Sequence, residues 1–128
     1  MAEVGPGLLA FIAVGPLLVL GYNLELFGGR FHSGFWFALA WGAFPVVTAY
    51  VACAGTIRVA AVLAAAWATL LSLAQRRLST PVRRLRREVV SVTGELGLAD
   101  GSREAVTRET LVAAPETALK LLTVATVA

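Results

Sequence analysis

Five side chains that can bind charged or polar groups lie close together near the start of the sequence. They are Tyr22, Asn23, Glu25, Arg30 and His32. The two basic residues could receive an anionic head group or a pyrophosphate, and Asn23 with Glu25 could offer oxygen ligands to Mg²⁺, although such sites need further carboxylates or phosphates. The same residues also fit a solvated loop with a Glu25–Arg30 ion pair and a helix-capping Asn23. We treat all five as candidates for a lipid or anion pocket.

No catalytic residue and no metal ligand set can be assigned from this cluster. His32 is the single histidine of the sequence. A histidine that has neither a second metal ligand nor a nucleophile beside it is weak evidence for catalysis. It fits better as a wet, amphipathic residue at a membrane surface. The sequence therefore leaves open whether the protein is an enzyme, and it predicts no cofactor for the chain on its own.

A second cluster holds six of the eleven basic residues: Arg76, Arg77, Arg83, Arg84, Arg86 and Arg87. The cluster comes directly after an apolar segment, where membrane proteins carry the charges that set their orientation. Each such arginine contributes about 1 kcal/mol of attraction to an anionic leaflet. We therefore expect these side chains to contact anionic lipid, and we expect no nucleic-acid partner.

The composition indicates that lipid surrounds much of the chain. Of 128 residues, 58% are hydrophobic and 15% are charged, and the mean hydropathy is +0.77. Soluble domains are about 45–50% apolar and about 25% charged. A chain of this size can bury only roughly 60–70% of its surface, so the excess of apolar side chains predicts a lipid bilayer as the main partner.

Three uncharged or nearly uncharged segments are long enough to cross the hydrocarbon core as helices. They cover about residues 5–24, 35–56 and 58–76, and together they predict a transmembrane region over residues 1–77. Pro16 and Pro45 should kink the first two helices. The third segment is rich in alanine, which allows helices to approach closely. Packing with other membrane helices or self-association is therefore an open possibility.

The remainder of the sequence is different. Residues 78–107 predict a basic cytoplasmic segment with a hairpin, because alternating apolar residues precede the turn signal Asp100-Gly101. Thr107 or Thr110 could cap the next helix. Residues 108–128 predict either an amphipathic helix or a truncated transmembrane helix. The expected fold is an all-α membrane protein with three transmembrane helices, a partial fourth and a small cytoplasmic β-hairpin-like insertion.

The arginine cluster also predicts an orientation. Basic residues favour the cytoplasmic side, so residues 77–112 should lie in the cytoplasm. Counting back along the predicted spans places residues 22–34 on the same side. We therefore expect an integral protein of the cell membrane.

The first half of the sequence resembles the UbiA-type intramembrane prenyltransferase superfamily, particularly bacterial inner-membrane members that act on quinones and pigments. The similarity covers about residues 15–77. The similar residues are Tyr22-Asn23, Glu25-Leu26, Gly28-Gly29, Phe37-Ala38-Leu39, Trp41-Gly42, Tyr50 and Ala54-Gly55-Thr56.

This resemblance implies a helical bundle that transfers an isoprenoid chain from a prenyl pyrophosphate, with Mg²⁺ held by two aspartate-rich motifs. Asp100 is the single aspartate of the sequence and lies outside the similar region, so neither motif is present and Mg²⁺ enters by family analogy alone. We therefore expect an incomplete or reduced UbiA-like module without independent catalytic activity, with an isoprenoid lipid as its partner. The alternative is a small non-enzymatic membrane protein whose helices pack with partners or with copies of themselves.

Overall fold

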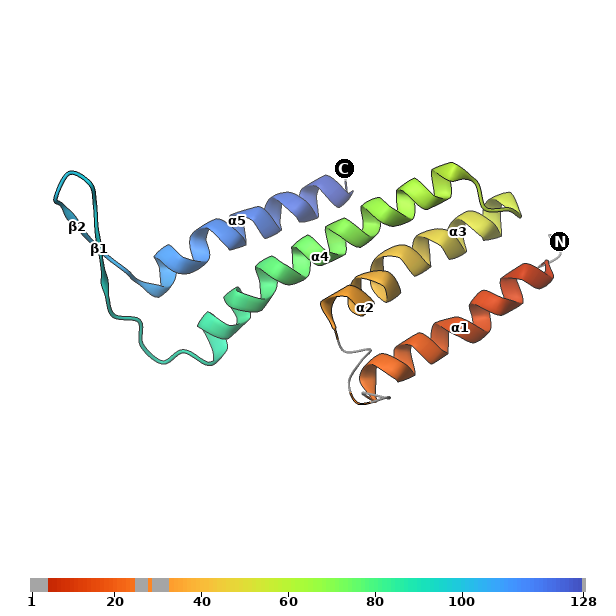
Figure 1. Ribbon diagram of the computed structural model, residues 1–128, viewed down its shortest axis with the longest axis horizontal. Helices are drawn as coiled ribbons and strands as arrows, with labels where there is room; N and C mark the ends of the chain where they lie inside the picture. Colours follow the sequence, from red (N-terminus) through yellow and green to blue (C-terminus); the bar gives the residue numbers. More distant parts are fainter. Residues whose placement is uncertain (1–4, 25–27, 29–32, 128) are drawn as a thin grey trace. The chain divides into compact units, whose positions relative to one another are not determined.

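The computed structural model describes residues 5–24, residue 28 and residues 33–127. Helices dominate this part of the chain, and one short pair of strands interrupts them (Figure 1). The chain divides into two compact units, Met1–Ala74 and Gln75–Ala128. We call them the first unit and the second unit and describe each separately.

The first helix, α1, runs from Pro6 to Asn23. Pro6 stands at its start, where the missing proline N–H costs nothing. Pro16 lies inside the helix without ending it. The bounds of α1 lie within the first predicted span of about residues 5–24, and its last turn contains Tyr22 and Asn23.

Three short helical elements follow each other without a break and correspond to the second predicted span. These elements are α2 (Gly34–Ala38), the π-helical turn η2 (Leu39–Ala43) and α3 (Phe44–Ala54). The amide of Phe44 donates to the carbonyl of Leu39, five residues back, which is the bond of a π-helix. Pro45 follows at once, so the irregularity expected at this proline takes the form of a π turn. Gly55 ends α3 with a φ of 67°, which glycine adopts without strain.

Helix α4 runs from Val59 to Arg87, beyond the expected end of the third span at residue 76. Its small side chains allow close packing within the first unit. Ala61 and Ala65 are buried, and a Cβ added to Gly42 would lie 2.6 Å from the backbone oxygen of Ala68. Glycine at this position therefore lets η2 approach the backbone of α4.

Large apolar side chains of α4 are exposed on another face. Five of them are each more than half exposed: Val59, Val62, Leu63, Trp67 and Leu70. Their successive spacings of three, one, four and three residues place them along one stripe of the helix. We call these five residues the α4 stripe. So many exposed apolar side chains on one surface mark contact with lipid or with another apolar surface.

Four helices in the described part of the chain are long and apolar enough to cross a membrane, by length and composition. They are Pro6–Asn23, Gly34–Ala54, Val59–Arg87 and Arg108–Val127, and within their apolar windows 6–11% of the residues are buried. These helices indicate an integral membrane protein. The last one, α5 (Arg108–Val127), is one continuous helix of 20 residues through Pro115, in the segment 108–128 where the sequence predicts a helix.

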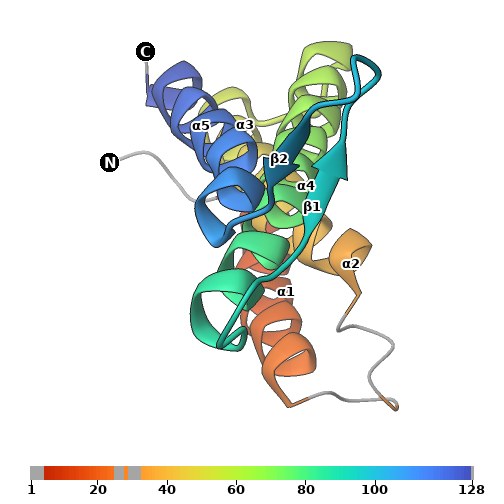
Figure 2. The same ribbon diagram turned by 90° about the vertical axis from the view of Figure 1, so that its left-hand side faces the viewer.

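The second unit confirms the predicted hairpin. Strands β1 (Glu95–Gly97) and β2 (Arg103–Ala105) pair antiparallel, with Leu96 opposite Glu104 (Figure 2). Asp100 and Gly101 form the turn, and Gly101 has a φ of 83°. Of the two threonines expected as caps, Thr107 is the one that caps α5, because its hydroxyl oxygen accepts from the amide of Thr110.

Candidate functional site

Three aromatic rings bring together the end of α1 and the elements α2 and η2. The ring of Tyr22 lies 5.8 Å from that of Phe37 and 5.6 Å from that of Trp41, measured between ring centroids. Phe37 and Trp41 are stacked, with an interplanar angle of 19° and a centroid distance of 5.6 Å. These distances are within the range of favourable aromatic contacts. We call the three residues the aromatic cluster.

An open groove of about 270 Å³ lies beside this cluster, between α1, η2 and α3. It is lined by Gly15, Leu18, Val19, Ala40, Trp41, Phe44 and Pro45. No lining residue carries a charge, and Trp41 belongs to both the groove and the aromatic cluster. We call it the apolar groove. It suits a hydrocarbon chain better than a polar ligand, because a polar group would find almost no hydrogen-bond partner there.

A glycine of α1 and the π turn η2 shape the apolar groove. Gly15 offers no side chain to the groove, and a Cβ at this position would lie 3.4 Å from the ring of Phe44. The π turn η2 brings Ala40 and Trp41 to the opposite wall. Sequence reasoning missed the groove because it contains no polar residue. One sequence feature could have indicated it. The pair Gly15-Pro16 lies in the first predicted span, and Pro45 lies in the aromatic-rich second span.

The five predicted pocket residues are only partly described by the structure. Tyr22 belongs to the aromatic cluster, and Asn23 donates its side-chain amide to the carbonyl of Val19 at 2.8 Å. This bond returns to a carbonyl four residues earlier in the same helix, and the C-cap residue of α1 is Leu24. Glu25, Arg30 and His32 lie outside the described residues, so a common pocket for all five stays a prediction.

The acidic residues that the structure describes do not form a metal site. Within residues 5–24, 28 and 33–127, no group of three or more histidine, cysteine, aspartate or glutamate side chains is placed to hold a metal ion. Asp100 is engaged in its own turn, where it accepts from the amide and the hydroxyl of Ser102. These two hydrogen bonds hold the pKa of Asp100 below its usual value.

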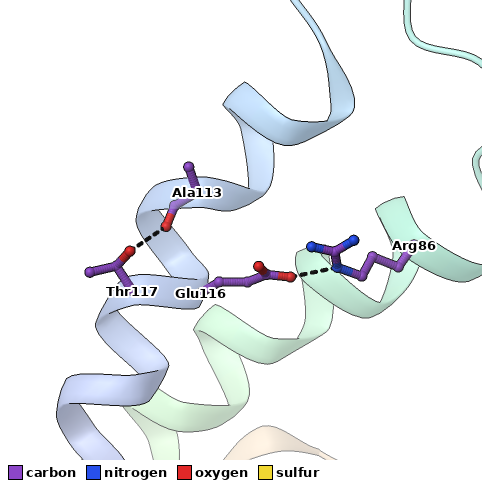
Figure 3. Close-up of polar contacts among 4 residues, drawn as sticks. All are labelled: Arg86, Ala113, Glu116 and Thr117. Carbon is purple, nitrogen blue, oxygen red and sulfur yellow. Dashed lines mark hydrogen bonds and ion pairs between the residues drawn. The ribbon is translucent and has the colours of Figure 1, made fainter.

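The arginine cluster lies entirely within the last turns of α4. Arg86 forms an ion pair with Glu116 of α5, with 2.5 Å between Nε and Oε1. Figure 3 shows Glu116 reaching toward α4, whereas Thr117 lies on another side of α5 and donates to the carbonyl of Ala113. Arg86 therefore links α4 to α5 within the second unit.

One basic residue missed by sequence reasoning fixes the chain that precedes the hairpin. The guanidinium of Arg108 donates to the carbonyl oxygens of Val89 at 2.6 Å and Val90 at 3.1 Å. Its Nε is buried and has no hydrogen-bond partner among the described residues. Since Arg108 opens α5, these bonds tie the chain just after α4 to the start of α5.

Comparisons with known protein families, with curated proteins and with solved structures find no match for this chain.

Proposed function

We propose that the protein binds the hydrocarbon chain of a membrane lipid in the apolar groove and does not transform that lipid by itself. The observation that carries this proposal is the groove, an uncharged recess in a unit whose helices are apolar enough to span a membrane. An isoprenoid chain is the proposed ligand, in keeping with the resemblance to UbiA-type prenyltransferases. In this proposal the chain is a reduced UbiA-like module.

The arrangement of the aromatic cluster supports a direction for the bound chain. Trp41 lines the groove, and Tyr22 packs against Trp41 at the end of α1. Asn23 follows directly and is exposed. A lipid whose tail occupies the groove would thus have its polar end near Tyr22 and Asn23, because these are the nearest described polar groups along the chain. The apolar lining offers nothing to a pyrophosphate deeper in the groove.

We propose lipid binding without prenyl transfer because the described residues include no cluster of carboxylates that could hold Mg²⁺. Transfer of a prenyl group from its pyrophosphate needs Mg²⁺ or equivalent positive charge against the phosphates. The sequence offers Asp100 as its single aspartate, and this residue lies in the hairpin of the second unit. The protein is therefore proposed to hold or present an isoprenoid lipid, with any transfer carried out by a separate partner.

The proposal can be tested by fluorescence in nanodiscs. A protein carrying Trp36→Phe and Trp67→Phe retains Trp41 as its single tryptophan. A nitroxide-labelled isoprenoid alcohol should quench Trp41 at lower concentration than a phosphatidylcholine labelled at its acyl chain. Gly15→Val should abolish this preference, because the added side chain points at Phe44 across the groove.

The matched control is Gly7→Val on the same helix, where an added Cβ meets no atom within 4 Å. It introduces the same side chain into open space and should keep the preference. Equal quenching by both labelled lipids would contradict the proposal, as would equal effects of the two valine substitutions.

A second candidate function is helix packing with a partner or with a second copy of the chain. The observation in its favour is the α4 stripe, whose five large side chains are uncovered. Trp67→Ala should lower association measured by energy transfer between labelled copies in proteoliposomes. If the α4 stripe faces only lipid, the substitution will leave the energy transfer unchanged.

A further inference from the structure

We propose that the hairpin of the second unit pairs with the same hairpin of a second copy of the chain, edge to edge through β1. The two hairpins then form one four-stranded antiparallel sheet with both β1 strands at its centre. This inference depends neither on the apolar groove nor on the α4 stripe. It follows from the exposure of the hairpin, from its register, and from two glycines in and beside β1.

The hairpin is uncovered within one copy. All six residues of β1 and β2 are exposed (Figure 2), and the sheet that the structure describes consists of these two strands. Leu96 and Leu98 share one face of β1 and are 54% and 46% exposed. A two-stranded hairpin alone is only marginally stable in water, and further strands stabilise it. The hairpin therefore offers edges that can accept another strand.

The register shows which backbone groups point outward. The amide of Leu98 donates to the carbonyl of Ser102 at 2.9 Å, so these two residues form a hydrogen-bonded pair. Bonded and non-bonded pairs alternate along an antiparallel ladder. Glu95 and Gly97 therefore direct their N–H and C=O groups away from β2, along the outer edge of β1.

Two glycines near this edge are not required by the fold of one copy. Gly94 precedes β1 and Gly97 ends it, and neither has a positive φ. A Cβ added to Gly97 would meet no atom within 4 Å, and one added to Gly94 would make an ordinary contact with Val106 at 4.0 Å. Glycine weakens a strand, and where no bend requires it, it often marks the close approach of another backbone.

The sequence around Leu96 is complementary to itself when two copies pair around a two-fold axis. Leu96 then lies opposite Leu96 of the second copy. The next pair on each side joins Glu95 to Gly97, and the pair after that joins Gly94 to Leu98. Each glycine thus lies opposite a larger side chain, and the two Glu95 carboxylates avoid facing each other directly, which would be destabilising.

The charges of the hairpin favour the same register. Arg103 and Glu95 lie on one face and form an ion pair at 3.2 Å. Because strands lie about 4.8 Å apart, Arg103 is about 10 Å from Glu95 of the second copy, measured between Cα atoms. Gly97 lies between them and has no side chain to separate them. The two arginines and two glutamates therefore alternate across the sheet as complementary charges.

The opposite face of the four-stranded sheet is apolar at its centre. The two Leu96 side chains meet at the two-fold axis. Leu98 of one copy lies over Gly94 of the other, next to Val106, which pairs with Gly94 in its own hairpin. Pairing therefore covers the exposed leucines. The interface is small, but copies that share a bilayer meet at a high effective concentration.

Disulfide cross-linking tests the centre of the proposed sheet. The reporter is a Cys53→Ser, Leu96→Cys protein in liposomes, in which residue 96 carries the single cysteine. Opposite residues of a non-bonded pair have Cα atoms about 4.5 Å apart, which a disulfide can bridge. Mild oxidation should therefore give a covalent dimer on a non-reducing gel.

The matched control for this reporter is Cys53→Ser, Glu104→Cys. Residue 104 lies opposite Leu96 on the same face and is also exposed. In the proposed sheet it belongs to the outer strands, about 14 Å from its counterpart in the second copy. It should give about ten-fold less dimer, because a disulfide cannot bridge that distance.

Two proline substitutions in the reporter test which edge is used. Gly97→Pro removes an N–H that points outward from β1, so it should lower the dimer yield about ten-fold while the bonds to β2 remain. Ala105→Pro removes an outward N–H of β2 instead, since Ala105 forms a non-bonded pair with Glu95. It should leave the dimer yield near that of the reporter.

Mixing two charge variants tests the contact between copies. In the reporter, Arg103→Glu alone or Glu95→Arg alone should lower the dimer yield about ten-fold, because each brings like charges together. The two variants mixed in the same liposomes should restore the yield, since each charge then meets its opposite in the other copy. The ion pair within each copy stays broken in the mixture, so only a contact between copies can restore the yield.

Three results would overturn the proposal. The first is an equal dimer yield from cysteines at residues 96 and 104, which would show random collision. The second is an equal loss of dimer in the two proline variants, which would show that the edge of β1 is not the contact. The third is a mixture of charge variants that stays as low as either alone, which would confine the Arg103–Glu95 pair to a single copy.

Discussion

The first unit and the second unit hold their helices together by different kinds of contact. In the first unit, helices approach through small residues and aromatic rings, as at Gly42 against Ala68 and at Tyr22 against Trp41. In the second unit, segments are also joined by polar contacts, such as the Arg86–Glu116 pair and the bonds from Arg108 to Val89, beside the buried side chains of Val82 and Val112. The first unit therefore relies on close apolar packing, and the second unit adds polar contacts to it.

Threonine hydroxyls in the helices of the first unit bond within their own helix, as those of Thr117, Thr123 and Thr126 do in α5. The hydroxyl of Thr48 donates to the carbonyl of Phe44, and the hydroxyl of Thr69 donates to the carbonyl of Ala65. Both bonds stay within one helix, so neither polar group needs a partner from another segment. This is the arrangement that lipid requires, because lipid offers no hydrogen bonds. Close packing then has to hold the helices together.

Gly42→Leu, a substitution in the first unit, should cause the largest loss of stability among the tests of this difference. The new side chain would begin 2.6 Å from the backbone oxygen of Ala68, which cannot move aside without displacing α4. We expect the free energy of unfolding in mixed micelles to fall by about 3 kcal/mol or more, the upper range for overpacking. Denaturation with sodium dodecyl sulfate, followed by circular dichroism, measures this change.

Gly7→Leu is the control for that substitution, because a side chain at residue 7 meets no atom within 4 Å. It should have little effect on stability. If both leucine variants unfold at the same detergent fraction, close approach at Gly42 is not what holds the first unit together.

A smaller effect is expected in the second unit from Arg108→Ala. The substitution removes both hydrogen bonds to the carbonyls of Val89 and Val90. We expect a loss of about 1.5 kcal/mol, the lower value for a hydrogen bond from a charged group, because the region is partly exposed. Hydrogen exchange should accelerate in residues 88–107 and stay unchanged in the first unit.

Arg103→Ala serves as the comparison, since Arg103 pairs with Glu95 on the exposed hairpin and its side chain is 78% exposed. An exposed pair of this kind contributes little. Equal acceleration of exchange by the two alanine variants would argue that Arg108 acts only through its charge.

The smallest effect concerns the hairpin turn and pH. Hydrogen bonds from Ser102 lower the pKa of Asp100 in the folded protein. A carboxyl whose pKa is lower in the folded state stabilises that state above its unfolded pKa of about 4, and this contribution is lost as the pH falls through the folded pKa. The amide of Ser102 should therefore exchange faster on acidification below about pH 4.

Asp100→Asn should remove that pH dependence, because asparagine does not titrate. Retention of the same acid-induced change in the asparagine variant would assign it to another group. The first unit should show no parallel change, since its described helices from Pro6 to Ala54 contain no acidic residue.

Local sequence signals predicted the elements that depend on local chemistry. The Asp100-Gly101 turn was found because these residues accept the backbone conformation of a tight turn, and Thr107 was found because its hydroxyl can cap a helix. The membrane character of the helices was predictable from apolar length alone. Each of these features is decided by a few neighbouring residues.

Features that depend on distant residues were not predictable in the same way. The end of the third span was expected at residue 76 because charges begin there, yet α4 continues to Arg87. Arginine is a good helix former, so a charge run marks the edge of a membrane without marking the end of a helix. The Arg86–Glu116 pair and the apolar groove involve residues that are far apart in sequence, and no local pattern indicates them.

The π turn at Leu39–Ala43 decides where this helix can lose a residue. A π turn holds one residue more than the α-helical turn it replaces. Loss of one residue there would restore a regular α-helical turn, and the segments before and after it would keep nearly the same faces, because the wide turn absorbs the extra residue. A one-residue change within α3 has no wide turn to absorb it and would rotate the following residues by about 100°. The same change in length would thus be tolerated within Leu39–Ala43 and would disturb the helix beyond it.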